Sequence, residues 1–306
     1  MDYLSPTTFI RYLNCEHQVY LLKIKKVPTE DSNQQTLAMA TGIAFDIMVK
    51  SALNRRFKRS DLLKDKIHPD NNAAIAVATS IMEHYERGPL QALKAEGIGY
   101  GGVDQEVEIE WTEPCENCQY FTDSNRSNGS TISCSKCKVH KSVLYGQPDL
   151  TLTSGNVIDW KVSGALSTSG AKPIDGYTRC FRDGKNLGDS SKADQPLESI
   201  RSDWATQTYL YARLLGHTVG NRLFAGIEYI AIGKDNSVSC CSYRNPISAE
   251  FQVKTEKQFH NAFAQLKSGE IPRAHATKRK CIQYNRVCGV AQHCESYQRA
   301  NAEGRL

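Results

Sequence analysis

The period of the hydrophobic pattern changes near residue 103, and this change constrains the fold more than any other sequence feature. Upstream, apolar residues recur at helical spacing in a segment that begins after Ser5 and in segments 37–53 and 71–95. Downstream, the pattern predicts strands at 103–111, 143–153, 156–162, 223–232 and 237–243, and helices at 199–215 and 249–267. Helices, then a strand meander, then a helix and more strands predict an α/β fold rather than a bundle or a barrel.

Composition limits the class of protein. With 306 residues, 40% of them hydrophobic, the chain can bury a full core as one domain. No apolar stretch is long enough to cross a bilayer, and the first residues lack the features of a signal peptide. We therefore expect a cytoplasmic protein, in a reducing compartment, that does not enter a membrane. The net charge of +5 is only weak support for a polyanionic partner, and the polar segment 164–198 is expected to be a loop.

The chain has eleven cysteines, and most of them are clustered. The odd count and the lack of a secretory signal disfavour a disulfide framework and favour metal binding. Three cysteines outside the clusters, Cys180, Cys240 and Cys241, need no special role, and burial as small apolar side chains accounts for them.

The first cluster consists of two Cys-X-X-Cys pairs, Cys115 with Cys118 and Cys134 with Cys137, with 15 residues between the pairs. This spacing predicts a zinc ribbon inserted over 112–141, in which four thiolates bind Zn²⁺. The polar intervening segment cannot bury an apolar core, so metal would supply its folding energy. His140 is an alternative ligand.

The second cluster, in segment 278–297, contains Cys281, Cys288 and Cys294. Three thiolates need a fourth to hold a four-iron cluster, and Cys15 in the first helix is the candidate. Zinc in place of iron and an unligated Cys281 remain open alternatives.

Two carboxylates and a lysine form the central motif. Gly146-Gln147-Pro148-Asp149 is followed ten residues later by Asp159-Trp160-Lys161. Side chains two residues apart on a strand share a face, and a turn at Ser154-Gly155 brings Asp149 beside them. Two carboxylates at one strand edge suit magnesium or manganese, and a neighbouring lysine can orient an attacking water. A bare Asp-X-Lys triplet is common on exposed strands, so the motif alone does not decide the function.

Two further features favour a functional site over ordinary charges on an exposed strand. Gln207 and Tyr211 lie four residues apart, on one face of the helix predicted at 199–215. Asp46 interrupts the apolar run 43–49, where a buried carboxylate needs a partner or a metal ion.

The ordered set resembles the RecB-type branch of the PD-(D/E)XK nucleases. That branch has a helical Gly-X-X-X-His motif, followed by Gly-X-X-Asp, Asp-X-Lys and Gln-X-X-X-Tyr. The same order here reads Gly42–Asp46, Gly146–Asp149, Asp159–Lys161 and Gln207–Tyr211. One departure matters: Asp46 stands where the branch usually has histidine, which bears on metal preference and on activity.

The resemblance implies a restriction-endonuclease-like mixed β-sheet flanked by helices, here with the zinc ribbon inserted. It implies that Asp149 and Asp159 hold Mg²⁺ or Mn²⁺, with Asp46 as a third ligand. Lys161 would position the nucleophilic water. The supporting residues, which would brace the site or touch DNA, are Gln207 and Tyr211.

The resemblance also bears on the second cysteine cluster. Several members of the branch, including CRISPR-associated adaptation nucleases and recombination helicase-nucleases, carry one early and three late cysteines around a 4Fe-4S cluster. In these relatives the cluster clamps the chain ends together, as Cys15 and segment 278–297 would here. The gap between Cys281 and Cys288 is wider than in the commonest form.

The implied activity is hydrolysis of DNA phosphodiester bonds by a stand-alone exonuclease. The expected substrate is single-stranded DNA or DNA ends in recombination, repair or adaptation, with recombination or replication proteins as candidate partners. One alternative is a structure-specific endonuclease that cuts flaps or branches. Another is a nucleic-acid-binding assembly factor with a vestigial site, whose binding would survive loss of Asp159. A zinc-ribbon regulator, the third, would bind DNA through the ribbon alone. The sequence does not predict an oligomeric state.

Overall fold

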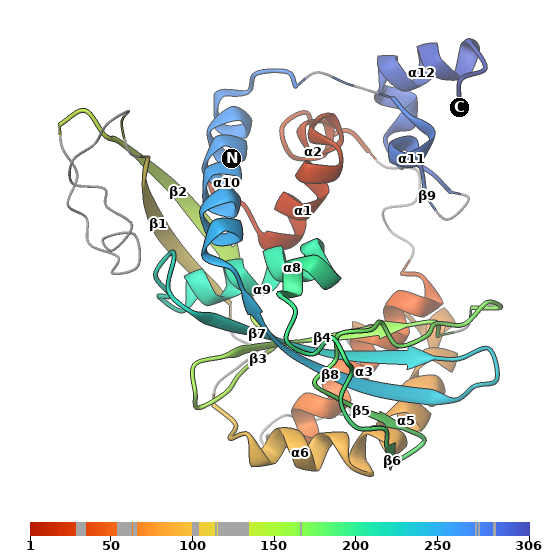
Figure 1. Ribbon diagram of the computed structural model, residues 1–306. Coiled ribbons are helices and arrows are strands. Elements are labelled where there is room, and N and C mark those ends of the chain that lie inside the picture. The colour runs from red at the N-terminus through yellow and green to blue at the C-terminus, as the bar shows by residue number, and fades with distance from the viewer. Residues whose placement is uncertain are drawn as a thin grey trace.

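The computed structural model describes a mixed α/β protein (Figure 1). The described residues are 1–28, 35–53, 63, 66–99, 104–113, 115, 135–165, 167–272, 274, 276–283 and 286–306. No helix in these ranges has both the length and the apolar character needed to cross a membrane.

The central sheet has six strands in the order β3-β4-β7-β8-β5-β6. Strand β4 runs parallel to β7, and the other neighbours pair antiparallel, so the predicted mixed sheet is confirmed. The predicted hairpin of β7 and β8 is confirmed as well. The strand bounds are β3 Leu150–Thr151, β4 Val157–Ser163, β5 Arg179–Arg182, β6 Lys185–Asn186, β7 Leu223–Ile232 and β8 Val238–Ile247.

Helices cover both faces of this sheet, as predicted (Figure 1). One face carries α1 (Pro6–Asn14), α2 (Glu16–Lys23), α8 (Leu197–Ile200), α9 (Ser202–Leu214) and α10 (Ala249–Ser268), and the other carries α3 (Leu37–Leu53), α5 (Ala73–Glu86) and α6 (Pro89–Ala95). Successive strand residues alternate between the two apolar cores: Val157 belongs to the core under α9 and Ile158 to the core under α3.

Three predicted elements are interrupted, each for a local reason. The first helix breaks at Cys15, whose backbone is extended. The helix predicted at 71–95 becomes η1 (Pro69–Asn71), α5 and α6, because Pro89 starts a new helix after the extended Gly88. The strand predicted at 143–153 divides into β2 (Lys138–Gly146) and β3, with Pro148 between them.

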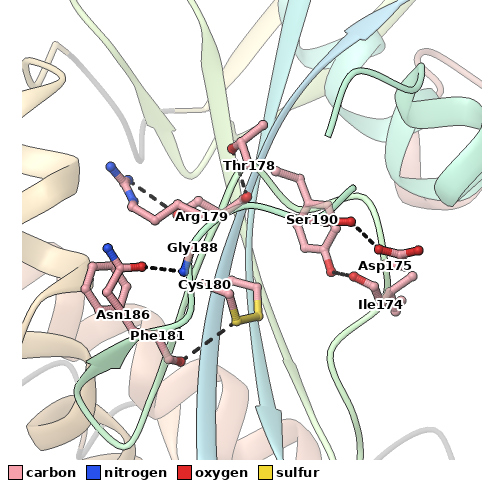
Figure 2. The surroundings of a disulfide bond; sticks show 12 residues. Ile174, Asp175, Thr178, Arg179, Cys180, Phe181, Asn186, Gly188 and Ser190 are labelled. Atoms are coloured by element: carbon pink, nitrogen blue, oxygen red, sulfur yellow. Dashed lines mark hydrogen bonds between the residues drawn. A yellow bond between two sulfur atoms is a disulfide. The ribbon is translucent and has the colours of Figure 1, made fainter. Parts of the chain in front are cut away.

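The segment 164–198 is not only a loop, because it contributes β5 and β6 to the sheet edge. It also forms a disulfide between Cys180 and Cys241, which corrects the expectation that these cysteines play no special role (Figure 2). The two residues lie directly opposite each other in the β5–β8 register, with Cα atoms 4.0 Å apart. Cys240 belongs to the other core, so it stays a buried free thiol.

A second sheet consists of β1 (Gln105–Glu113) and β2, a long hairpin that extends away from the central sheet (Figure 1). It is anchored on α9 and α10 by a buried polar network centred on Glu256. This carboxylate contacts Arg213 Nε at 2.5 Å and Tyr209 Oη at 2.8 Å, and His260 Nε2 at 3.1 Å. His260 contacts Ser142 of β2 through its other ring nitrogen, at 2.7 Å. These contacts give His260 a structural role.

The C-terminal segment lies beside α2 (Figure 1). It follows α10 and consists of short elements: α11 (Lys278–Cys281), β9 (Ile282–Gln283), β10 (Arg286–Val287), η2 (Ala291–His293) and α12 (Glu295–Ala302).

A buried ion network joins β7, β8 and the end of α6. Arg244 Nη2 lies 2.5 Å from Glu228, whose side chain is 1% exposed, and Arg244 Nε lies 2.7 Å from Glu96. Tyr85 donates a hydrogen bond to Glu228 at 3.3 Å. Removal of one partner from such a pair leaves a desolvated charge.

We therefore expect Arg244→Met to lower the free energy of unfolding by about 3–5 kcal/mol, because Glu228 would keep its burial and lose its counter-ion. Denaturant titration measures this loss. The control is Arg182→Met, since Arg182 and Asp235 are both exposed and their separation is 3.4 Å. That variant should cost about 1 kcal/mol or less. Equal costs for the two variants would contradict the role of burial.

Candidate functional site

Asp149 sits at the edge of the sheet, directly before β3 begins at Leu150. The β3–β4 ladder pairs Leu150 with Ile158, and continuing the same register would place Pro148 opposite Trp160. Proline has no N–H to donate, so the ladder stops, and the backbone N–H of Trp160 donates instead to Asp149 Oδ2 at 3.0 Å. The side chain of Asp149 thereby lies alongside β4, as the sequence predicted.

Asp159 and Lys161 share one face of β4, the face covered by α9. Lys161 Nζ lies 2.7 Å from Asp159 Oδ2 and donates to Gln207 Oε1 at 2.7 Å. Gln207 in turn donates through Nε2 to Asp159 Oδ1 and to Tyr211 Oη, each at 3.1 Å. The structure therefore brings together four of the predicted residues, with the amide of Gln207 at their centre.

Gly146 has a steric reason for its place in the motif. A Cβ atom there would come within 3.1 Å of the Tyr211 ring and 3.0 Å of Leu214. The backbone of β2 therefore approaches α9 closely, which seats Tyr211 beside Gln207.

Asp46 reaches the same site from α3, on the opposite side of the sheet edge. Its carboxylate contacts Lys50, one helical turn later, with Nζ–Oδ1 2.8 Å and Nζ–Oδ2 2.9 Å. Lys50 Nζ also lies 3.4 Å from Asp149 Oδ1. Burial lowers the pKa of Lys50, but Asp149 and Asp46 together outweigh it and the pKa is raised, so the ammonium stays charged.

Lys50 was not among the predicted site residues. The available signal was its spacing of four residues from Asp46, which places the two side chains on one helix face.

The two lysines only partly compensate the negative charge of the carboxylates at this site. Burial, reinforced by the charge of Asp149, raises the pKa of Asp46 to about 6. Burial also raises the pKa of Asp159 to about 7, against the opposing effect of Lys161. The Asp159 side chain is only 3% exposed. Asp46 Oδ1 and Asp159 Oδ2 are buried and accept no hydrogen bond of good geometry, although each touches a lysine ammonium.

This donor set has the chemistry of a site for a hard divalent cation. Three carboxylates from three chain segments offer oxygen ligands of the kind that Mg²⁺ and Mn²⁺ prefer. Within the described ranges, no three Asp, Glu, His or Cys side chains are already placed to hold an ion together. At this site Lys50 lies between Asp46 and Asp149.

The four cysteines of the second cluster gather where the C-terminal segment meets α1 and α2. Burial, together with Cys294 and Cys15, raises the pKa of the Cys281 thiol. Burial, together with the other three cysteines, also raises the pKa of Cys288. This electrostatic influence places Cys15 on the same side of the molecule as the late cysteines, but among the described residues no three of these side chains are arranged to hold a metal ion together. The Cys288 N–H donates to the carbonyl of Cys281 at 2.7 Å.

Half of the other cysteine cluster is described. Cys115 and Cys137 lie at the end of the β1–β2 hairpin, with their Sγ atoms 3.9 Å apart. Two thiolates on one tetrahedral zinc ion, each bonded at about 2.3 Å, would be about 3.8 Å apart. Cys118 and Cys134 lie outside the described residues. His140, the alternative ligand, contacts Glu113 through Nε2 at 3.1 Å.

The raised carboxylate pKa values predict how stability depends on pH. The folded chain keeps protons on Asp46 and Asp159 that the unfolded chain releases near pH 3.8. The stability that these protons contribute is full below that pH and is lost as pH rises through about 6 to 7.

In metal-free buffer we therefore expect the Tm of the wild type to fall more, between about pH 5 and about pH 8, than that of Asp159→Asn, which cannot ionise. Thermal unfolding followed by circular dichroism measures both. Identical pH profiles would show that Asp159 is not the group responsible. Added Mn²⁺ should stabilise the wild type more at the higher pH, because ligands bind metal when deprotonated.

Three comparisons with known proteins add no relative. No family model, no curated protein and no solved structure matches this chain. What is known of the site is therefore its own geometry: three carboxylates, two lysines and an amide at one edge of a mixed sheet.

Proposed function

We propose that this protein is a divalent-metal-dependent deoxyribonuclease of the PD-(D/E)XK type. The observation that carries the proposal is the meeting of Asp46, Asp149, Asp159 and Lys161 at one sheet edge, from segments far apart in sequence. A mixed sheet with helices on both faces supports a restriction-endonuclease-like fold. Strand β3 pairs with only two residues of β4, so the ladder on this side of β4 does not continue past residue 158.

In this proposal the three carboxylates hold Mg²⁺ or Mn²⁺. The bound ion would polarise a phosphoryl oxygen and ease deprotonation of the attacking water. Lys161 orients that water and shares its proton, and the amide of Gln207 holds Lys161 and Asp159 at fixed positions. Tyr211 braces Gln207. Because the donors are held in place before substrate arrives, little reorganisation is needed during hydrolysis.

The substrate we favour is single-stranded DNA or a DNA end, processed exonucleolytically in recombination, repair or adaptation. The cysteine clusters would hold a 4Fe-4S cluster on Cys15, Cys281, Cys288 and Cys294, and Zn²⁺ on the hairpin cysteines. The mutual influence of the four thiols supports the first, and the 3.9 Å separation of Cys115 and Cys137 supports the second.

One observation favours a second candidate, a nucleic-acid-binding assembly factor with a vestigial nuclease site. The ammonium of Lys50 already contacts both Asp46 and Asp149. A site permanently closed in this way would bind DNA without needing a divalent ion.

The nuclease proposal predicts metal-dependent cleavage of end-labelled DNA. We expect Lys161→Met and Asp149→Asn each to lower the rate at least about 100-fold, because one removes the water-orienting group and the other a metal ligand. Lys254→Met, at an exposed position of α10, is the control and should cut at the wild-type rate. Products from single- and double-stranded substrates, labelled at either end, give the strand preference and polarity. If the wild type and both site variants bind DNA equally and none cuts, the assembly-factor proposal replaces this one.

The cofactor proposal predicts metal content that can be removed one cluster at a time. Protein purified without air should contain iron and absorb visible light, and Cys15→Ser should lose both, because the cluster would lack its fourth thiolate. Cys115→Ser should lose zinc and keep iron. Cys240→Ser, a buried thiol in neither cluster, should keep both metals. Zinc without iron in the wild type would show that the second cluster is a zinc site.

A further inference from the structure

Lys50 holds the carboxylate oxygens that a metal ion would need. Asp149 accepts the N–H of Trp160 at Oδ2, and its Oδ1 faces Lys50 Nζ at 3.4 Å. Both oxygens of Asp46 lie within 2.9 Å of the same ammonium. Lys50 therefore sits at the position between two of the three proposed ligands.

The two lysines of the site are anchored differently. Lys161 contacts Asp159 and is also held by the side-chain oxygen of Gln207 at 2.7 Å. Lys50 is held by Asp46 and Asp149, and by no third side chain among the described residues. Its own side chain is 13% exposed, so its charge is largely removed from water. A largely desolvated ammonium needs both of these carboxylates to compensate its burial.

We propose that Lys50 is a built-in cation that occupies the Asp46–Asp149 position in the metal-free protein and competes with the divalent ion for it. This inference rests on the proposed metal site. The ammonium and the metal ion compete for these oxygens, because two cations held between the same carboxylates repel each other. Lysine suits such an exchange, since it is a point charge on a flexible four-carbon stem that can move aside within one helical turn.

The exchange has two consequences of opposite sign. Without metal, Lys50 stabilises the fold by separating two carboxylates that would otherwise repel each other. With metal, the same contacts must be broken, so the apparent affinity for the ion is lower than the carboxylates alone would give. Removal of the Lys50 charge should therefore lower the stability of the metal-free protein and, in the same variant, strengthen metal binding.

The test is a comparison of Mn²⁺ binding and thermal stability in the full chain. Free Mn²⁺ is titrated by electron paramagnetic resonance, and Tm is recorded with and without the ion. We expect Lys50→Met to bind Mn²⁺ at least about tenfold more tightly than the wild type. We also expect its Tm to be lower without metal and to rise further on saturation. Lys50→Arg, which keeps the charge, should bind Mn²⁺ no more tightly than the wild type. The control Lys254→Met should bind Mn²⁺ as the wild type does.

The outcomes separate this inference from the proposed function. Asp149→Asn tests the metal site itself, so loss of Mn²⁺ binding there supports the site. Unchanged or weaker binding in Lys50→Met, with binding lost in Asp149→Asn, would overturn the competition while leaving the metal site intact. If Asp149→Asn binds Mn²⁺ as the wild type does, the ion lies elsewhere and both proposals fail. Tighter binding in Lys254→Met as well would overturn the inference, because any lost positive charge would then suffice.

Discussion

A carboxylate buried at a sheet edge is the constraint on which the rest of this site depends. Asp159 is almost fully covered, and its charge is accommodated by an ammonium at 2.7 Å and an amide at 3.1 Å. Both partners come from fixed positions, Lys161 on the same strand and Gln207 on the helix above it. Even so, the pKa of Asp159 is raised to about 7, so these partners do not fully offset its burial. A buried carboxylate with a perturbed pKa beside a charged partner is typical of functional sites, and this supports the cation site proposed here.

The position of β4 is held from both faces. Asp159 and Lys161 face α9, whereas Trp160 between them faces α5, where its indole N–H donates to Tyr85 at 3.1 Å. Tyr85 belongs to the Glu228 and Arg244 ion network. A shift of β4 by one residue would exchange the two faces and bury a lysine in the apolar core. The polar network on the far face therefore keeps the carboxylates in register on the near face.

Periodicity was sufficient to predict several strands of the sheet and the shared face of Asp159 and Lys161, because both depend on local geometry. The mixed sheet itself was implied by the family resemblance. Asp159 and Lys161 share a face through the strand repeat, and Gln207 and Tyr211 share one through the helix repeat. The elements β5 and β6, and the disulfide of Cys180, depend on pairing with β8, about 60 residues away in sequence. No local pattern reports such a partner. The same limit applies to Lys50: its contact with Asp46 follows from helical spacing, but its contact with Asp149 requires the folded chain.

Asp46, which differs from the histidine of the motif that the chain resembles, forms an ion pair with Lys50, and the charges of these two residues are best considered together. A histidine at this position could bind a metal ion as a neutral ligand. Aspartate adds a negative charge next to Asp149, and the pKa of Asp46 is raised to about 6 by burial and by that neighbour. Lys50, one turn along the same helix face, returns the site to the net charge it would have with neutral histidine and no lysine. The aspartate is therefore compensated within the protein, and its difference from the histidine of the motif that the chain resembles does not by itself argue against an active site. Under the proposed function, the aspartate changes the metal-free state, because Lys50 contacts the two carboxylates that are proposed to bind the ion.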